Sequence, residues 1–169
     1  MSGLDFPLLF LFPLGMGAAA ALDLLTFTIP NRVSTALLTG FLATAVLIGI
    51  PGQIIFSHLS AALAVLLFGF LAFARGWVGG GDAKLMAAAA LWLGFEHLLP
   101  FLLWTAILGG GLALLLLAYR RMLPPPWLIR QTWALRLHDP KEGIPYGIAL
   151  AGAALIVYPQ TIWMTGIAG

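Results

Sequence analysis

The chain has 169 residues, of which 62% are hydrophobic and only 8% are charged. A soluble globular domain carries about 25% charged residues, so this composition excludes a soluble surface and predicts an all-α, polytopic membrane protein. The net charge of +2 does not indicate a nucleic-acid partner, because basic residues in a membrane protein usually encode its orientation. The absence of cysteine excludes disulfides, thiolate zinc sites and cysteine nucleophiles.

Apolar runs separated by proline and glycine predict six membrane-spanning helices, because one span needs about 20 mostly apolar residues. The first run follows Asp5 with no basic residue before it, so we interpret it as a retained span and not as a cleaved signal peptide. We expect one membrane-embedded domain over residues 1–169, with a cytoplasmic loop at about 120–143. The helices are predicted at residues 6–25, 34–50, 55–74, 83–98, 99–119 and 144–165.

The basic residues lie in or beside the connections that follow the first, third and fifth predicted helices. They are Arg32, Arg75, Lys84, Arg120, Arg121, Arg130, Arg136 and Lys141. The other two connections, around Gln53 and Glu96, contain no lysine or arginine. By the positive-inside rule we expect a multi-pass protein with these connections in the cytoplasm and both termini outside. We interpret residues 120–143 as a loop or amphipathic helix that lies on the cytoplasmic leaflet, in preference to a role in substrate binding.

Two acidic residues are expected inside the thickness of the bilayer, where charged groups are costly and usually mark function. Asp23 is near the cytoplasmic end of the first helix, and Asp82 begins the fourth. At about 1.5 Å per helical residue, both carboxylates come to a similar depth below the cytoplasmic surface. Two neighbouring carboxylates share one proton, so one can act as a base and the other as an acid on a water and a peptide bond. Asp23 and Asp82 are therefore the candidate catalytic pair, and no metal ion is required.

Gly79, Gly80 and Gly81 directly precede Asp82 and allow two interpretations. Glycine permits positive φ and leaves no side chain, so a substrate backbone could approach the acid closely. Alternatively, the glycines form a plain turn and Asp82 caps the following helix. The matched depth of Asp23 favours the first interpretation. Lys84 is expected on a different helix face, where it either balances the charge of the site or extends to the interface.

Three short motifs occur in a fixed order along the chain. Asp23 is followed by Ile-Pro-Asn at 29–31, residues 79–85 read Gly-Gly-Gly-Asp-Ala-Lys-Leu, and residues 144–147 read Ile-Pro-Tyr-Gly. Together they resemble the type IV prepilin peptidases, a family of aspartyl intramembrane proteases with a GxGD signature. The resemblance implies that Asp23 and Asp82 are catalytic. It also implies that other motif residues bind substrate or shape the site: Gly79, Gly80, Gly81, Lys84, Pro30, Asn31, Pro145, Tyr146 and Gly147.

The resemblance implies removal of a short basic leader from type IV pilin-like precursors at the cytoplasmic face, without a cofactor. It is closest to the compact CpaA/TadV branch, which serves Flp-type pili. Long bifunctional members carry a cysteine-containing cytoplasmic domain and also methylate the new N-terminus. This sequence has no cysteine, so we expect no methyl transfer. The implied partners are a prepilin or pseudopilin precursor and the lipid bilayer, and the oligomeric state is left open.

Two other classes of membrane protein remain as alternatives. In an ion-coupled transporter, Asp23 and Asp82 would relay protons or bind a cation, but the two halves of the chain show no convincing internal repeat. In a non-catalytic subunit of a pilus or secretion assembly, neither acid would be needed for turnover. Substitution of the acids distinguishes the classes, because a protease loses cleavage and a transporter loses flux.

Overall fold

Helices make up the regular structure of the chain, and no strand occurs among residues 5–122, 128 and 131–165, which the computed structural model describes. The elements are α1 (Asp5–Thr26), α2 (Asn31–Ile48), α3 (Gly52–Ala74), α4 (Gly80–Leu93), α5 (Leu98–Arg121), α6 (Thr132–His138), α7 (Tyr146–Val157), the 3-10 turn η1 (Tyr158–Gln160) and α8 (Ile162–Thr165). Helices satisfy their own backbone hydrogen bonds, which a bilayer cannot do for them. The prediction of an all-α protein is confirmed.

Several helices are long and apolar enough to cross a bilayer. Three helical stretches meet this condition, and two shorter apolar helices accompany them: 31–48, 52–74 and 80–121, then Phe10–Thr26 and Tyr146–Gln160. The stretch 80–121 contains both α4 and α5. Large apolar side chains such as Phe56, Leu67 and Phe68 are exposed on α3, as expected of a surface that faces lipid. The chain is therefore a polytopic membrane protein.

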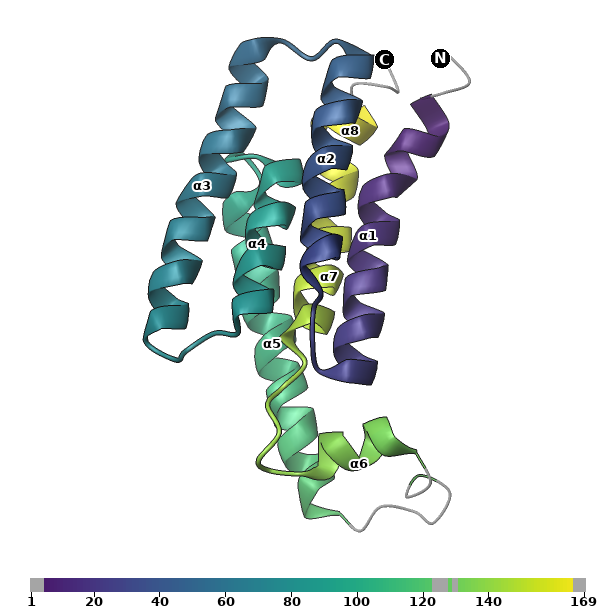
Figure 1. Cartoon of the computed structure of the whole chain (residues 1–169), viewed down its shortest axis with the longest axis vertical. Coiled ribbons are helices and arrows are strands. Elements are labelled where there is room, and N and C mark those ends of the chain that lie inside the picture. Colours follow the sequence, from purple (N-terminus) through teal and green to yellow (C-terminus); the bar gives the residue numbers. More distant parts are fainter. Residues whose placement is uncertain (1–4, 123–127, 129–130, 166–169) are drawn as a thin grey trace.

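Helix α4 lies at the centre of the bundle. Figure 1 shows α3 on one side of it and α2 on the other, with α1 beyond α2 and with α5 and α7 behind. Every residue from Leu85 to Leu93 is buried, and the small side chains of Ala87–Ala90 let neighbouring helices approach closely. The helix that carries Asp82 is thus held on several sides by other helices.

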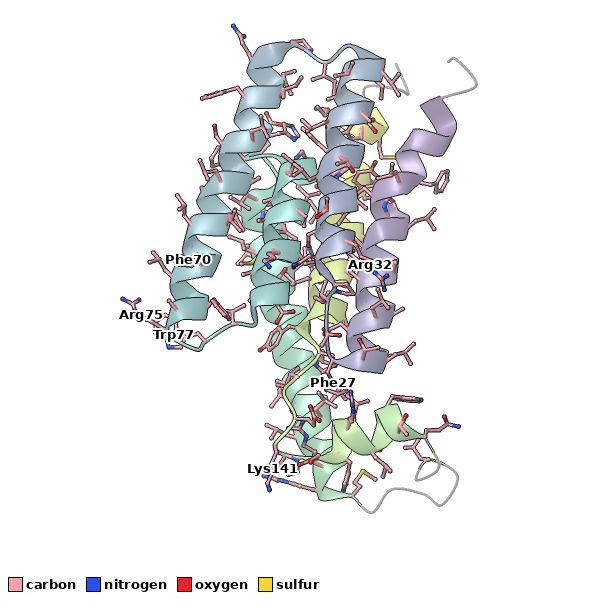
Figure 2. All side chains as sticks on the ribbon, in the orientation of Figure 1. Phe27, Arg32, Phe70, Arg75, Trp77 and Lys141 are labelled. Atoms are coloured by element: carbon pink, nitrogen blue, oxygen red, sulfur yellow. The ribbon has the colours of Figure 1, made fainter. Side chains whose placement is uncertain are left out.

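The connections between helices alternate between the two ends of the bundle. Those that follow α1, α3 and α5 gather at one end, and those that follow α2 and α4 lie toward the other (Figure 1). Figure 2 shows Arg75 and Lys141 at the first of these ends, which we call the basic end, whereas Arg32 lies further along the bundle beside α1. This alternation agrees with the predicted order of spans. The assignment of the basic end to the cytoplasm stays a prediction.

All six predicted helices have shifted ends in the structure, and two of them differ most from their predicted boundaries. Pro159 has no backbone N–H, so the helix predicted at 144–165 breaks into α7, η1 and α8. Helix α4 begins earlier than expected, at Gly80, and ends at Leu93 because Gly94 adopts a positive φ of 72°. The six predicted helices are therefore present among the described residues, but these two boundaries were wrong.

The polar segment predicted as a surface loop contains one short helix, α6. It packs against the far end of α5, below the bundle in Figure 1. The Tyr119 hydroxyl of α5 donates a hydrogen bond to the Ala134 carbonyl of α6 at 3.3 Å. Trp127 and Arg130, which belong to the same predicted loop, lie outside the described residues. The described part of this loop is thus docked onto the bundle.

Candidate active site

Asp23 lies in the last turn of α1 and is only 5% exposed. Its Oδ2 atom accepts a hydrogen bond from the backbone N–H of Gly147 at 2.7 Å. Its own backbone carbonyl accepts the N–H of Phe27, whose left-handed φ of 55° ends the helix. Since Gly147 is in the first turn of α7, Asp23 satisfies one of the N–H groups that a helix start leaves without a partner. One carboxylate therefore joins α1 to α7.

Asp82 lies in the first turn of α4 and lines a cavity of about 560 Å³. The cavity wall also contains Met86 of the same helix, Thr105 of α5 and Leu150 of α7. Asp82 is close enough to Asp23 for the charges of the two carboxyl groups to interact. The fold thus brings together the two acids that the sequence singled out, and one of them is open to a cavity large enough for several side chains.

The segment from Gly79 to Asp82 is the start of α4 and not an irregular loop. Gly79 is the N-cap with a φ of −68°, and the glycines with positive φ among the described residues are Gly49, Gly76 and Gly94. The expectation of positive φ before Asp82 is therefore wrong. The Asp82 carboxylate accepts the backbone N–H of Gly79, as an acid at the third helical position does in a capping box. The backbone therefore agrees with the second interpretation, in which Asp82 caps the start of the following helix.

The three glycines of this motif are needed for close packing. A Cβ atom at Gly79 would lie 2.8 Å from Asp82 Oδ2, and one at Gly80 would lie 3.3 Å from the Phe73 ring. A Cβ atom at Gly81 would lie 3.2 Å from the Cβ of Ile29. The space in front of Gly80 and Gly81 is thus filled by side chains of the protein itself, whereas we had expected an open path for a substrate backbone.

The Ile-Pro-Asn motif meets the start of α4 at two points. Ile29 packs on Gly81, and the Asn31 side chain accepts a hydrogen bond from the Lys84 ammonium at 2.9 Å. Pro30 is the N-cap of α2, with an extended ψ of 142°. Lys84 lines a groove beside α2 and α3, whereas Asp82 lines the cavity on another side of α4. Lys84 therefore ties α2 to α4, and it lies on a different face from Asp82.

The Pro-Tyr-Gly motif forms the entry into α7. Pro145 is the N-cap of this helix, and the Tyr146 side chain lines the Asp82 cavity. The Tyr146 ring lies against Gly109 of α5, where a Cβ atom would come within 2.7 Å of the ring. At Gly147 a Cβ atom would lie 2.8 Å from Asp23 Oδ2. The motif thus lies beside both acids, because Tyr146 lines the cavity of Asp82 and Gly147 contacts Asp23.

Residues 10–114, more than half of the chain, match the sequence model of the type IV leader peptidase family. The chain belongs to this family. The matched region includes Asp23, Asp82 and Lys84, and it ends before the Pro-Tyr-Gly motif at 145–147. No curated protein and no solved structure matches the chain significantly. Family membership makes the protein a membrane peptidase, in agreement with the resemblance seen in its sequence.

No side-chain cluster of this peptidase that the structure describes is suited to a metal ion: three or more His, Cys, Asp or Glu residues do not come together within the described ranges. The site offers two carboxyl groups, the hydroxyl groups of Thr105 and Tyr146, backbone N–H groups and a largely apolar cavity wall.

The mouth of the peptidase cavity carries an exposed tryptophan that the sequence analysis did not single out. Trp77 is 69% exposed and lines the cavity together with Val78 and Gly79. The Arg75 guanidinium lies 5.3 Å from the centroid of the Trp77 ring, within the range of a cation–π interaction. Figure 2 shows this pair at the turn between α3 and α4. A tryptophan beside an arginine is typical of a residue at the membrane interface.

Two arginines of the peptidase that were interpreted only as orientation charges make hydrogen bonds near the site. Arg120 of α5 donates through Nε to the Leu137 carbonyl at 2.9 Å. Arg136 of α6 donates to the Thr26 carbonyl at the end of α1 at 3.4 Å. Hydrogen bonds from arginine to backbone carbonyls have no sequence signature, so counting charges could not have revealed them.

Proposed function

We propose that this peptidase is an intramembrane aspartyl endopeptidase. Asp23 and Asp82 would remove the short basic leader of type IV pilin-like precursors at the cytoplasmic face of the bacterial inner membrane. The observation that carries the proposal is that two acids of an apolar bundle lie beside the start of α7: Gly147 contacts Asp23, and the adjacent Tyr146 lines the cavity that contains Asp82. Membrane-embedded carboxyl groups are costly and persist where they serve a function.

Two neighbouring carboxyl groups can hydrolyse a peptide bond without a covalent intermediate. Because both cannot ionise cheaply, the pair holds one proton between them. The ionised carboxylate takes a proton from a water molecule, whose oxygen attacks the scissile carbonyl carbon. The protonated carboxyl group gives its proton to the departing nitrogen as the C–N bond breaks. The products are a leader with a new carboxylate and a precursor with a new amino terminus, and the pair again holds one proton.

The position of the acids suits a substrate that is itself a membrane helix. A leader with lysine or arginine is held in the cytoplasm by the positive-inside preference, while the apolar helix behind it lies in the bilayer. The scissile bond between them then lies at the interface. Asp82 is in the first turn of α4, beside the connection that carries Arg75 and Trp77. A short unwinding of the precursor at the leader junction would expose its peptide bond to the cavity.

We also propose a narrower assignment, to the branch of the family that processes Flp-type pilins. The chain has no cysteine, and its longest polar stretch, residues 120–143, contains no glycine-rich nucleotide turn. We therefore propose leader removal without methyl transfer. Purified peptidase, precursor and S-adenosylmethionine should give the mass of the bare mature chain. A product heavier by one methyl group would contradict this part of the proposal.

The proposal is tested by replacing each acid with its amide in lipid nanodiscs. Asp23→Asn and Asp82→Asn should each abolish cleavage of a precursor peptide, because either change removes the shared-proton pair without changing side-chain size. Mass spectrometry of the peptide products measures cleavage, and thermal unfolding confirms that the variants are folded. Glu96→Gln is the matched control, since Glu96 follows α4 at the opposite end of that helix from Asp82. Near wild-type cleavage by either aspartate variant would refute the assignment.

A further inference from the structure

Two adjacent arginines at the end of α5 have the same formal role in orientation but very different surroundings. The Arg120 side chain donates through Nε to the Leu137 carbonyl at 2.9 Å, and through Nη2 to the Glu142 carbonyl at 2.9 Å and the Gly143 carbonyl at 3.1 Å. Arg121 is exposed, and its side chain has no hydrogen-bond partner in the part of the chain that the structure describes. A role in membrane orientation alone would not require the contacts that Arg120 makes.

The three acceptors of Arg120 lie at both ends of the connection between α6 and α7. Leu137 is in the last turn of α6, where backbone carbonyls lack helical partners. Glu142 and Gly143 lie just before the N-cap of α7. A guanidinium group is planar, always charged, and presents several donors in fixed directions, so it can hold separate carbonyls at once. Lysine would offer a single ammonium on a flexible stem and could not reproduce this geometry.

The connection held by Arg120 leads directly into the active site. Gly143 and Ile144 line the cavity that contains Asp82. Pro145 follows with its restricted φ, and Gly147 then donates its backbone N–H to Asp23 at 2.7 Å. Little freedom therefore remains between the Arg120 contacts and the Asp23 contact. Displacing the connection would move a cavity wall and the hydrogen-bond donor of Asp23 together.

We propose that Arg120 is a positioning residue of the active site. Its guanidinium fixes the connection between α6 and α7, so that α7 begins where the Gly147 N–H meets Asp23 and the cavity beside Asp82 is closed on one side. Arg120 does not touch the reacting atoms and acts only through the backbone. The catalytic consequence rests on the proposed function, whereas the structural arrangement can be measured independently of it.

The kinetic test compares Arg120→Ala and Arg120→Lys with Arg121→Ala, in nanodiscs, on a synthetic peptide with a basic leader and an apolar helix. Because small displacements of catalytic groups are costly, both Arg120 variants should lower kcat by about ten- to a hundredfold with little change in KM. Arg121→Ala removes the same charge from the same turn and should leave kcat within about twofold of the wild type. Added guanidinium at millimolar concentration should partly restore kcat in Arg120→Ala alone. Equal kcat values in Arg120→Ala and Arg121→Ala would overturn the proposal.

Hydrogen exchange measures the positioning without reference to cleavage. In Arg120→Ala the Gly147 amide should exchange faster than in the wild type, whereas in Arg121→Ala it should keep its wild-type rate. Protection of Gly147 at the wild-type level in Arg120→Ala would overturn the proposal, whether or not the protein cleaves the peptide. If the wild-type protein cleaves nothing, the proposed function fails, and the exchange of Gly147 alone then decides whether Arg120 positions α7.

Discussion

The two ends of helix α4 are surrounded by different kinds of contact. Toward its C-terminal end the core is an aromatic cluster formed by Phe12, Phe41, His58, Trp92 and Trp163, which come from α1, α2, α3, α4 and α8. The rings of Trp92 and Trp163 have centroids 5.1 Å apart, and the Trp163 indole N–H donates to the Trp92 carbonyl at 2.6 Å. These ring contacts fill the interior of this half of the bundle.

At the N-terminal end of α4 the helices are joined through glycines and hydrogen bonds, beside a cavity. Gly81 packs on Ile29, Lys84 donates to Asn31, and Asp82 lines the cavity of about 560 Å³. A cavity forgoes the dispersion contacts that the aromatic cluster makes. We therefore expect stability to be concentrated in the aromatic half and, under the proposed function, turnover to depend on the cavity half, as is common for sites that must admit a ligand.

The largest effect on stability is expected in the aromatic cluster. Trp92 is fully buried and donates its indole N–H to the Leu37 carbonyl at 2.9 Å. Trp92→Ala leaves a large cavity and removes this hydrogen bond, so it should reduce the free energy of unfolding by about 3–5 kcal/mol. Thermal unfolding in nanodiscs measures this loss. Cleavage per folded molecule should stay near the wild-type value, and a loss of cleavage without a loss of stability would break the comparison.

A smaller cost in stability but a large cost in turnover is expected at Gly147. A Cβ atom there would lie 2.8 Å from Asp23 Oδ2 and 2.9 Å from its Cβ, so Gly147→Ala must displace the carboxylate. We expect about 1–3 kcal/mol of destabilisation and about a hundredfold loss of turnover. The peptide-cleavage assay measures the loss of turnover, and the thermal unfolding curve measures the destabilisation. Proportionate loss of folded protein and turnover would instead mean that Gly147 matters only for packing.

Gly110 provides the matched control for this substitution. It lies inside α5, and a Cβ atom built on it meets no heavy atom of the described residues within 4 Å. Alanine is a better helix former than glycine, so Gly110→Ala should increase the free energy of unfolding by about 0.5–1 kcal/mol and leave turnover unchanged. The two variants thus compare the same substitution at a glycine that contacts Asp23 and at one that contacts no other side chain of the described residues.

Much of the fold was predictable from sequence, because the bilayer imposes strong rules on apolar length and on charge. Those rules gave the six helices, and the cost of burying a carboxyl group singled out Asp23 and Asp82. Helix boundaries were less certain, since Pro159 interrupts an apolar run that remains apolar on both sides. Hydropathy alone contains no signal for such a break.

The contacts that shape the site were not predictable in the same way. Gly80 and Gly81 were expected to provide positive φ, whereas in the structure they leave room for Phe73 and Ile29. These two side chains lie outside α4 and come near the glycines only when the chain packs. The hydrogen bonds of Arg120 end on backbone carbonyls, which every residue possesses. Sequence patterns can indicate which side chains are costly or unusual. They do not reveal which backbone groups a side chain will reach after folding.

The smallest predicted effect concerns Thr44 and Thr105, whose buried hydroxyl groups lack, within the described part of the chain, the hydrogen bonds that other threonines make. Thr26 and Thr39 donate to the carbonyls four residues earlier, as threonines in helices often do. The buried hydroxyls of Thr44 and Thr105 have no partner among the described residues. Thr44 is fully buried in α2, and Thr105 lines the Asp82 cavity. The pair therefore allows the same substitution to be made away from the cavity and at its wall.

Valine keeps the approximate shape of threonine and removes the hydroxyl. Burying a hydroxyl without a partner costs free energy, so Thr44→Val and Thr105→Val should each raise the free energy of unfolding, by up to about 1 kcal/mol. Chemical denaturation of the two variants and the wild type, in the same lipid, measures the difference. A stabilised Thr44→Val beside a destabilised Thr105→Val would show that water in the cavity satisfies the Thr105 hydroxyl. In that case the cavity would already be hydrated before a precursor enters, and a water molecule for hydrolysis would be present at its wall.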